Sequence, residues 1–227
     1  MYEERRSTTV EAVVWSSVAA GSHLVLPDGC MDVLWWRDAL VLAGPDTVAH
    51  RSGATTGEPV VGLRFDPGVL PALLGVPAHA LTDQRVALGD VWDTARTRQL
   101  EEQLTGCLDA GAVETAIVVA LGPETGRDDP GHARRHVVAR IADGWSIAAL
   151  AAETGWSERH LLRRSREWFG YGPTVLRRVL RLQRVMDAAG SGRPLAQVAC
   201  DVGYSDQAHL SRDVRALTGT TIGALTR

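Results

Sequence analysis

The side chains best suited to chemistry recur in two similar segments of the chain, which lie 48 to 49 residues apart. Each segment predicts a short helix that carries polar side chains on one face. An arginine guanidinium can donate two hydrogen bonds to the O6 and N7 atoms of guanine, and a glutamine amide can pair in the same way with adenine. Two such faces in one chain predict binding to double-stranded DNA across successive turns of the duplex.

The exposed face of each predicted helix lies opposite its apolar stripe. In the first segment a helix that begins at Ser157 exposes one face, and in the second a helix over residues 206–217 exposes the matching face. Leu162 and Ala208 cannot hydrogen-bond a base, so they either touch thymine methyl groups or contribute nothing. The residues expected to bind DNA are Arg159, Leu162, Arg163, Arg166, Gln207, Ala208, Ser211 and Arg212.

A phosphate contact or a solvated surface charge is the simpler interpretation of any single arginine in this set. Phosphate contacts position a protein on DNA without reading sequence, and they make its affinity depend steeply on salt. A further set of arginines is expected to neutralise phosphates in this way, namely Arg134, Arg135, Arg177, Arg178, Arg181 and Arg184.

The sequence around both helices is typical of a helix-turn-helix unit. Ser146 and Ser157 are the expected N-caps, and the tryptophan before each of them is expected to pack against a leucine of the helix that follows. Gly155 and Gly203 stand where the tight turn between two helices requires a positive φ. The two predicted units cover residues 146–169 and 194–218.

Charge divides the chain into two parts. Residues 131–227 carry 15 arginines against 8 acidic residues, a balance of +7, whereas residues 1–130 carry 9 against 19, a balance of −10. A basic part behind an acidic part is typical of a DNA-binding module joined to a sensor or dimerisation module. We therefore expect an N-terminal domain over residues 1–122, a linker over 123–131 and a DNA-binding domain over 132–227.

Over about 95 residues the C-terminal part resembles the AraC family of transcription regulators. The resemblance rests on both helix-turn-helix units, on the helix between them, and on the glycine-containing exits WFGYGP (168–173) and LTGTTI (217–222). It implies two subdomains bridged by a long helix near residues 174–189, and a sequence-specific regulator that inserts two recognition helices into successive major-groove segments. The family's base-reading positions fall on Arg159, Leu162, Arg163, Gln207, Ala208 and Arg212.

Two places depart from the family's pattern. Arg164 and Ser165 stand where apolar residues usually complete the buried stripe of the first recognition helix, which puts the packing of that unit in doubt. Ile222 stands where the family usually has proline, and this change looks harmless. We therefore expect a well-packed second unit and a more electrostatic first one.

The N-terminal part predicts short strands followed by helices. Apolar segments separated by turn signals run from residue 10 to residue 65, and helical patterns begin at Pro67. Together with the helical C-terminal part, this predicts an α+β protein of two domains, with a small β-sandwich or cupin-like barrel and its following helices in front of an all-α double helix-turn-helix. The part resembles a little-characterised domain that precedes AraC-type modules, which implies effector binding, dimerisation or both.

One cluster in this part could hold a metal ion. Asp28, Cys30 and Asp32 alternate and would share one face of a strand, with His23 or His50 as a further ligand. However, the His-x-His and following Glu of a metal-binding cupin are missing, and a cysteine on a half-buried strand usually packs. Nothing in the sequence indicates a lowered thiol pKa that would make Cys30 a redox switch. We expect no metal, no cofactor and no catalytic residue.

Arg64 and one helical stripe have two interpretations each. Arg64 could bind an anionic effector in the β-domain, although an arginine paired with a carboxylate is the favoured interpretation. A stripe in the helical region that follows could form a dimer interface, or it could pack inside its own domain. That stripe consists of Leu100, Leu104, Cys107 and Leu108.

Composition limits the partners. Three widely spaced cysteines argue against a disulfide framework, and no apolar run is long enough for a signal peptide or a membrane span, so we expect a cytoplasmic protein without membrane contact. Double-stranded DNA is the expected partner; RNA polymerase, a small-molecule effector and a second copy of the chain are left open. The alternative function is a small-molecule-binding or enzymatic β-domain fused to a module that tethers it to DNA.

Overall fold

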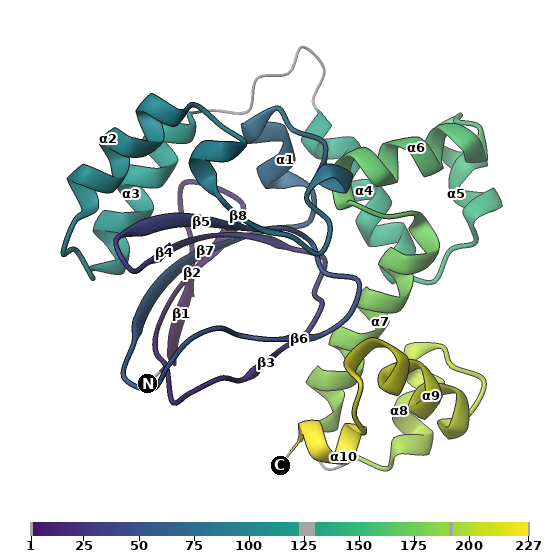
Figure 1. Ribbon diagram of the computed structural model, residues 1–227. Coiled ribbons are helices and arrows are strands. Elements are labelled where there is room, and N and C mark those ends of the chain that lie inside the picture. The colour runs from purple at the N-terminus through teal and green to yellow at the C-terminus, as the bar shows by residue number, and fades with distance from the viewer. Residues whose placement is uncertain (1, 123–129, 191–192, 227) are drawn as a thin grey trace.

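The computed structural model describes residues 2–122, 130–190 and 193–226 (Figure 1). Most of the expected linker, residues 123–131, lies outside this part of the chain. Within the described residues no helix is both long enough and apolar enough to cross a membrane.

The N-terminal part is built on an antiparallel sheet of six strands. Four long apolar segments expected to be strands are confirmed. The edge strand over residues 2–6 was not expected, because all of its residues except Tyr2 are charged. A separate two-stranded sheet pairs β3 (Leu24–Val25) with β6 (His50–Arg51). The six strands, in spatial order, are β1 (Tyr2–Arg6), β2 (Ala12–Val18), β7 (Pro59–Phe65), β4 (Met31–Trp36), β5 (Ala39–Ala43) and β8 (Arg85–Ala87).

Helices cover one face of this sheet (Figure 1). Helices α2 (Thr94–Leu104) and α3 (Ala110–Leu121) pack on it, and their buried side chains share one core with the inward-facing side chains of the strands. Leu100 and Leu104 are 4% and 2% exposed, so the first two leucines of the stripe that had two interpretations pack inside this core, whereas Leu108 is 58% exposed. Shorter elements follow the sheet, namely α1 (Val69–Leu74) and the 3-10 helices η1 (Ala78–Ala80) and η2 (Leu88–Asp90).

The C-terminal part consists of helices, as expected. Helix α7 runs between two similar helical groups, one at each end, and each group has its own apolar core (Figure 1). The helices are α4 (Pro130–Ala142), α5 (Ile147–Thr154), α6 (Glu158–Phe169), α7 (Pro173–Ala189), α8 (Leu195–Val202), α9 (Gln207–Thr218) and α10 (Ile222–Leu225).

The turn chemistry expected from the sequence is present in both groups. Ser146 and Ser157 accept hydrogen bonds from the backbone N–H groups three residues on, and therefore cap α5 and α6. Gly155 and Gly203 end the first helix of each unit with φ of 69° and 85°, a conformation that side chains disfavour. The two copies of the sequence repeat thus fold into the same helix-turn-helix shape.

The two polar residues in the unusual stripe of α6 differ in their burial. Ser165 is fully buried together with Leu161 and Phe169, as the stripe predicts. Arg164 lies with its guanidinium carbon 5.5 Å from the ring centroid of Trp168, and it pairs with Glu167 at 3.3 Å. Since a guanidinium is attracted to the face of an indole ring, Arg164 covers the aromatic core of the unit while its charge stays accessible to solvent.

Candidate nucleic-acid interface

The first recognition helix presents the expected face to solvent. Arg159, Arg163 and Arg166 are exposed along α6, and Leu162 between them is 39% exposed. None of these three arginines forms an ion pair with a carboxylate among the residues that the structure describes. Arg163 lies 3.4 Å from the Nδ1 atom of His160. The face is therefore positively charged and available to a polyanion.

The second recognition helix presents a matching face with a different character. All four of its predicted DNA-binding residues are exposed, and Asp206 caps α9 by accepting a hydrogen bond from the His209 backbone N–H at 2.7 Å. This backbone hydrogen bond is the main reason that the pKa of Asp206 is lowered. The residues of this face are Gln207, Ala208, Ser211 and Arg212.

Helix α7 fixes the second unit through a shared carboxylate. Asp213 of α9 accepts a hydrogen bond from Arg178 of α7 at 2.7 Å and another from the Tyr204 hydroxyl at 3.0 Å. Arg181, also on α7, lies over the Tyr204 ring at 5.3 Å from its centroid. These contacts hold α9 in one orientation relative to α7, so Arg178 and Arg181 serve the fold of the unit.

The other arginines expected to neutralise phosphates also have structural partners. The prediction for Arg134 is wrong, because this side chain is 1% exposed and pairs with Glu11 at 3.3 Å. Arg135 pairs with the same carboxylate, Arg177 donates to the Trp145 carbonyl, and Arg184 donates to the Ala142 carbonyl at 3.0 Å. Burial of Arg134 depends on the docking of the N-terminal part, which no local pattern reveals.

The N-terminal part packs against the end of α6. The Thr82 hydroxyl donates to the Gly170 carbonyl at 3.1 Å, just after the last turn of that helix. A Cβ atom on Gly170 would lie 2.6 Å from Thr82 Oγ1 and 2.7 Å from Pro45 Cγ, so the backbone approach requires glycine. Gly68 makes a similar approach, since its Cβ would lie 2.4 Å from Arg134 Cδ. The first helix-turn-helix unit is therefore docked on the β-domain.

The same domain also contacts α7 and the second unit. The Gln183 amide on α7 donates to the Pro27 carbonyl at 2.7 Å. The Ala49 backbone N–H donates to the Leu217 carbonyl, in the last turn of α9, at 2.7 Å. Because Pro45 meets the first unit and Ala49 the second, we call residues 44–50 the bridging segment.

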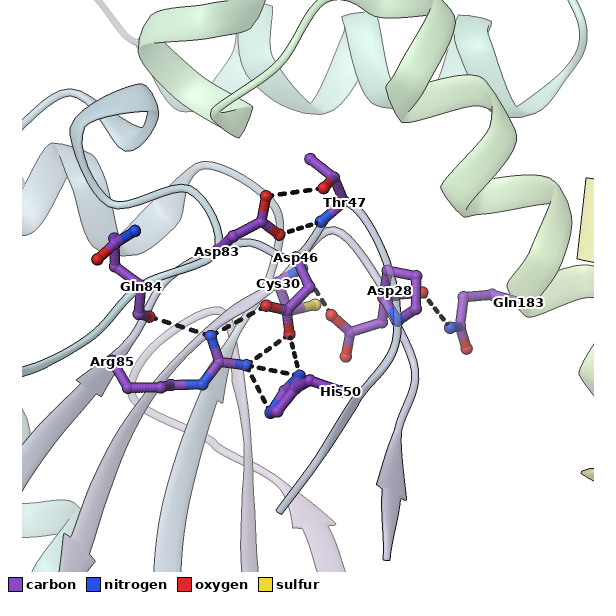
Figure 2. A network of polar contacts seen from close by, with 10 residues as sticks. Asp28, Cys30, Asp46, Thr47, His50, Asp83, Gln84, Arg85 and Gln183 are labelled. Atoms are coloured by element: carbon purple, nitrogen blue, oxygen red, sulfur yellow. Dashed lines mark hydrogen bonds and ion pairs between the residues drawn. The ribbon is translucent and has the colours of Figure 1, made fainter. Parts of the chain in front are cut away.

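A network of polar contacts holds the bridging segment in place (Figure 2). Asp46 accepts two hydrogen bonds from Arg85, at 2.9 and 2.6 Å, and lies 3.3 Å from His50. Asp83 accepts from both the backbone N–H and the hydroxyl of Thr47 at 2.7 Å. No local sequence pattern predicts this network, because its members come from two segments, residues 46–50 and 83–85, whose paired residues lie 36 to 39 positions apart in the chain.

The candidate metal cluster forms a polar group around Arg64. Asp32 and Arg64 are direct partners across β4 and β7, and Asp28 lies 3.8 Å from the Arg64 guanidinium. Arg64 also donates to the Tyr2 hydroxyl at 2.8 Å. The favoured interpretation of Arg64, pairing with carboxylates, is confirmed. Burial raises the pKa of the Cys30 thiol well above its usual range, which disfavours the reactive thiolate.

Asp32 makes the stability of the β-domain depend on pH. Its pKa is raised from 3.8 to about 7, first by burial and then by the charge of Asp28, although Trp15 donates to it and Arg64 and Arg85 favour its charge. Between these values the unfolded chain has released a proton that the folded chain keeps, so stability falls as pH rises through this range. We expect Asp32→Asn to raise the melting temperature at pH 8 and to give no such gain at pH 4.

Thermal melts of the full chain at both pH values test this expectation. An asparagine oxygen can still accept the 2.9 Å hydrogen bond from Trp15 Nε1, so the substitution removes only the charge. Asp90→Asn is the matched control, because Asp90 is exposed. An equal gain at pH 4 and pH 8 would show that ionisation of Asp32 does not limit stability.

Comparisons with known proteins agree with this geometry. A family model described as a helix-turn-helix domain matches residues 150–227, and one described as a domain of unknown function, DUF6597, matches residues 8–87. A search of curated proteins found no match.

Several solved structures are similar to the chain. One is a probable AraC family transcriptional regulator from Rhodopseudomonas palustris CGA009, with 24% identity, 40% of this chain and 88% of that chain covered, and a TM-score of 0.36. Another is the C-terminal domain of AraT, a response regulator from Geobacillus stearothermophilus. It is 20% identical, the match covers 45% of this chain and 88% of that chain, and the TM-score is 0.40. A third is ToxT from Vibrio cholerae strain SCE256 bound to an unsaturated fatty acid. It is 13% identical, the match covers 99% of this chain and 97% of that chain, and the TM-score is 0.46.

The matched helix-turn-helix domain spans α6 and the whole second unit, and the second match covers the sheet in front of them apart from β1. The resemblance stated from the sequence is thereby confirmed, and the general function of a DNA-binding transcription regulator follows from it. The chain carries a helix-turn-helix domain over residues 150–227 and, in front of it, a DUF6597 domain over residues 8–87.

Proposed function

We propose that this regulator reads an asymmetric DNA site by inserting α6 and α9 into successive major-groove segments. The observation that carries the proposal is the pair of exposed, matching faces at opposite ends of α7. Helix α7 has 17 residues, which at 1.5 Å each span about 25 Å. Major-groove faces of one side of a duplex recur about every 34 Å, so helices that extend beyond both ends of α7 can reach two of them.

We further propose that the N-terminal domain controls this binding through the bridging segment. Pro45 lies against Gly170 of the first unit, and Ala49 donates a hydrogen bond to the second. A shift of this segment would therefore change the placement of both recognition helices relative to each other. Domain contacts that differ between two states are the physical requirement for such coupling.

Footprinting of the full chain on genomic DNA fragments tests the reading mode. We expect discrete sites with two protected segments about one helical turn apart. Uniform coating without discrete sites would contradict the proposal and indicate a non-specific DNA-packaging protein. A single protected segment would show that only one recognition helix enters the groove.

The alternative function, a ligand-binding or enzymatic β-domain tethered to DNA, has less support. Arg64 and Arg85, two cations of the β-domain that could contact an anionic small molecule, already contact carboxylates. Ion pairs between arginine and aspartate side chains are the contacts expected where arginines stabilise the fold. We therefore propose no second function for the β-domain.

A further inference from the structure

A groove lies between the N-terminal domain and the first recognition helix. It has a volume of about 590 Å³. Its walls are His79 of η1 on one side and, from α6, Arg159, Leu162, Arg163 and Arg166 on the other. These four α6 residues are the predicted DNA-binding residues of the first unit, so a residue of the β-domain shares their surface.

The position of His79 is set by tight packing beneath it. Ala78, the preceding residue, is fully buried, whereas His79 itself is exposed. Thr82, two residues after η1 ends, donates the hydrogen bond to the Gly170 carbonyl. Element η1 therefore rests on the C-terminal end of α6 and holds the imidazole beside the recognition face without covering it.

The groove carries an excess of positive charge. Its three arginines form no ion pair with a carboxylate among the described residues, and its one carboxylate, Glu167, is engaged by Arg164 at 3.3 Å. An imidazole N–H adds a further donor at the edge. Dense positive charge with hydrogen-bond donors and no bound counter-charge fits a phosphate backbone.

The direction of α6 indicates which part of DNA would lie there. Helix-turn-helix proteins contact bases mainly with the N-terminal residues of the recognition helix, which here are Arg159 to Arg163. Arg166 lies seven positions after Arg159, a rise of about 10 Å along the helix axis. The major groove is about 12 Å wide. With Arg159 among the bases, Arg166 and His79 would lie at the rim, where the sugar-phosphate chain runs.

We propose that His79 of the N-terminal domain contacts a DNA phosphate beside the first recognition helix, so that the DNA interface spans both domains. This inference rests on the proposed function of α6. It assigns the DUF6597 part of the chain a direct contact with DNA, in addition to its contacts with the helix-turn-helix units.

The test compares charge variants of His79 in the full chain. Binding of each variant to a footprinted site and to a random duplex is measured at several salt concentrations. His79→Glu is expected to weaken binding to both duplexes about fivefold, because a carboxylate near a phosphate is repelled. His79→Arg is expected to tighten binding to both and to steepen the slope of log affinity against log salt by about 1.

A matched control separates this effect from net charge. Gln103→Glu adds the same charge at an exposed position of α2, a helix that lies on the other side of the fold from α6 (Figure 1), and it should leave binding unchanged. His79→Glu and Gln103→Glu with equal affinities would overturn the inference, as would tighter binding by His79→Ala, which would mean that the domain obstructs DNA. Loss of binding by Arg163→Ala on the same duplex would show that the proposed function stands in either case.

Discussion

Replacing Arg163 or Arg212 with alanine is expected to weaken binding to the specific site about 5- to 150-fold, because a bidentate contact with guanine discriminates by about 1–3 kcal/mol. Both side chains are exposed at equivalent positions of α6 and α9, 49 residues apart. Binding to random DNA should fall much less, since random DNA offers each arginine a phosphate but seldom the right base.

Competition titrations with specific and random duplexes measure this difference directly. Arg163→Lys and Arg212→Lys keep the charge but lose the planar two-donor geometry, so they should behave like the alanine variants on the specific site. Arg98→Ala, on the exposed surface of α2, is the matched control. Equal losses on specific and random DNA would reduce both arginines to phosphate contacts.

Substitution of Gly170 by alanine is expected to destabilise the protein far more than the equivalent substitution of Gly219. Both glycines end a recognition helix in the left-handed region, with φ of 84° and 71°, which costs alanine about 1–2 kcal/mol. Only at Gly170 would the new Cβ also meet Thr82 and Pro45, at 2.6 and 2.7 Å, whereas at Gly219 nothing lies within 4 Å. Such overpacking adds about 1–3 kcal/mol.

Urea unfolding of both variants measures the two contributions. The loss of stability shared with Gly219→Ala is the cost of the backbone conformation, and the excess loss in Gly170→Ala is the cost of the clash between the new Cβ and the N-terminal domain. We also expect Gly170→Ala to unfold less cooperatively, because the clash weakens one of the contacts that couple the two domains. Equal losses in the two variants would mean that the docking of α6 on the β-domain contributes little to stability.

The helix-turn-helix units could be predicted because their determinants are local. Ser146 and Ser157 lie one turn from the backbone groups that they cap, and Gly155 and Gly203 meet the need for positive φ at the turn itself. The buried stripe of α6 was predicted for a similar reason, since helical periodicity places its residues on one side. Determinants of this kind act over a few residues and do not require contacts between distant parts of the chain.

The docking between domains could not be predicted, because it depends on pairs distant in sequence. Arg134 and Glu11 are 123 residues apart, and an isolated arginine on a helix gives no sign that it will be buried. His79 sits in a short 3-10 helix without apolar periodicity, so no pattern connects it to α6. Edge strand β1 was missed because its polar, exposed residues do not alternate.

If both helix-turn-helix units grip DNA as proposed, the bridging segment limits the DNA sites that the protein can bind. Pro45 and Ala49 lie only four residues apart in a segment pinned by Asp83 and Arg85, yet they contact opposite helix-turn-helix units. For a regulator that grips DNA with both units, one base pair added between the half-sites moves the second by about 3.4 Å and rotates it by about 35°. Hydrogen bonds to Asp83 and Arg85 would oppose the shift of the bridging segment that such a change requires. The affinity of the protein for DNA would thus depend on the number of base pairs between the two half-sites as well as on the bases within them.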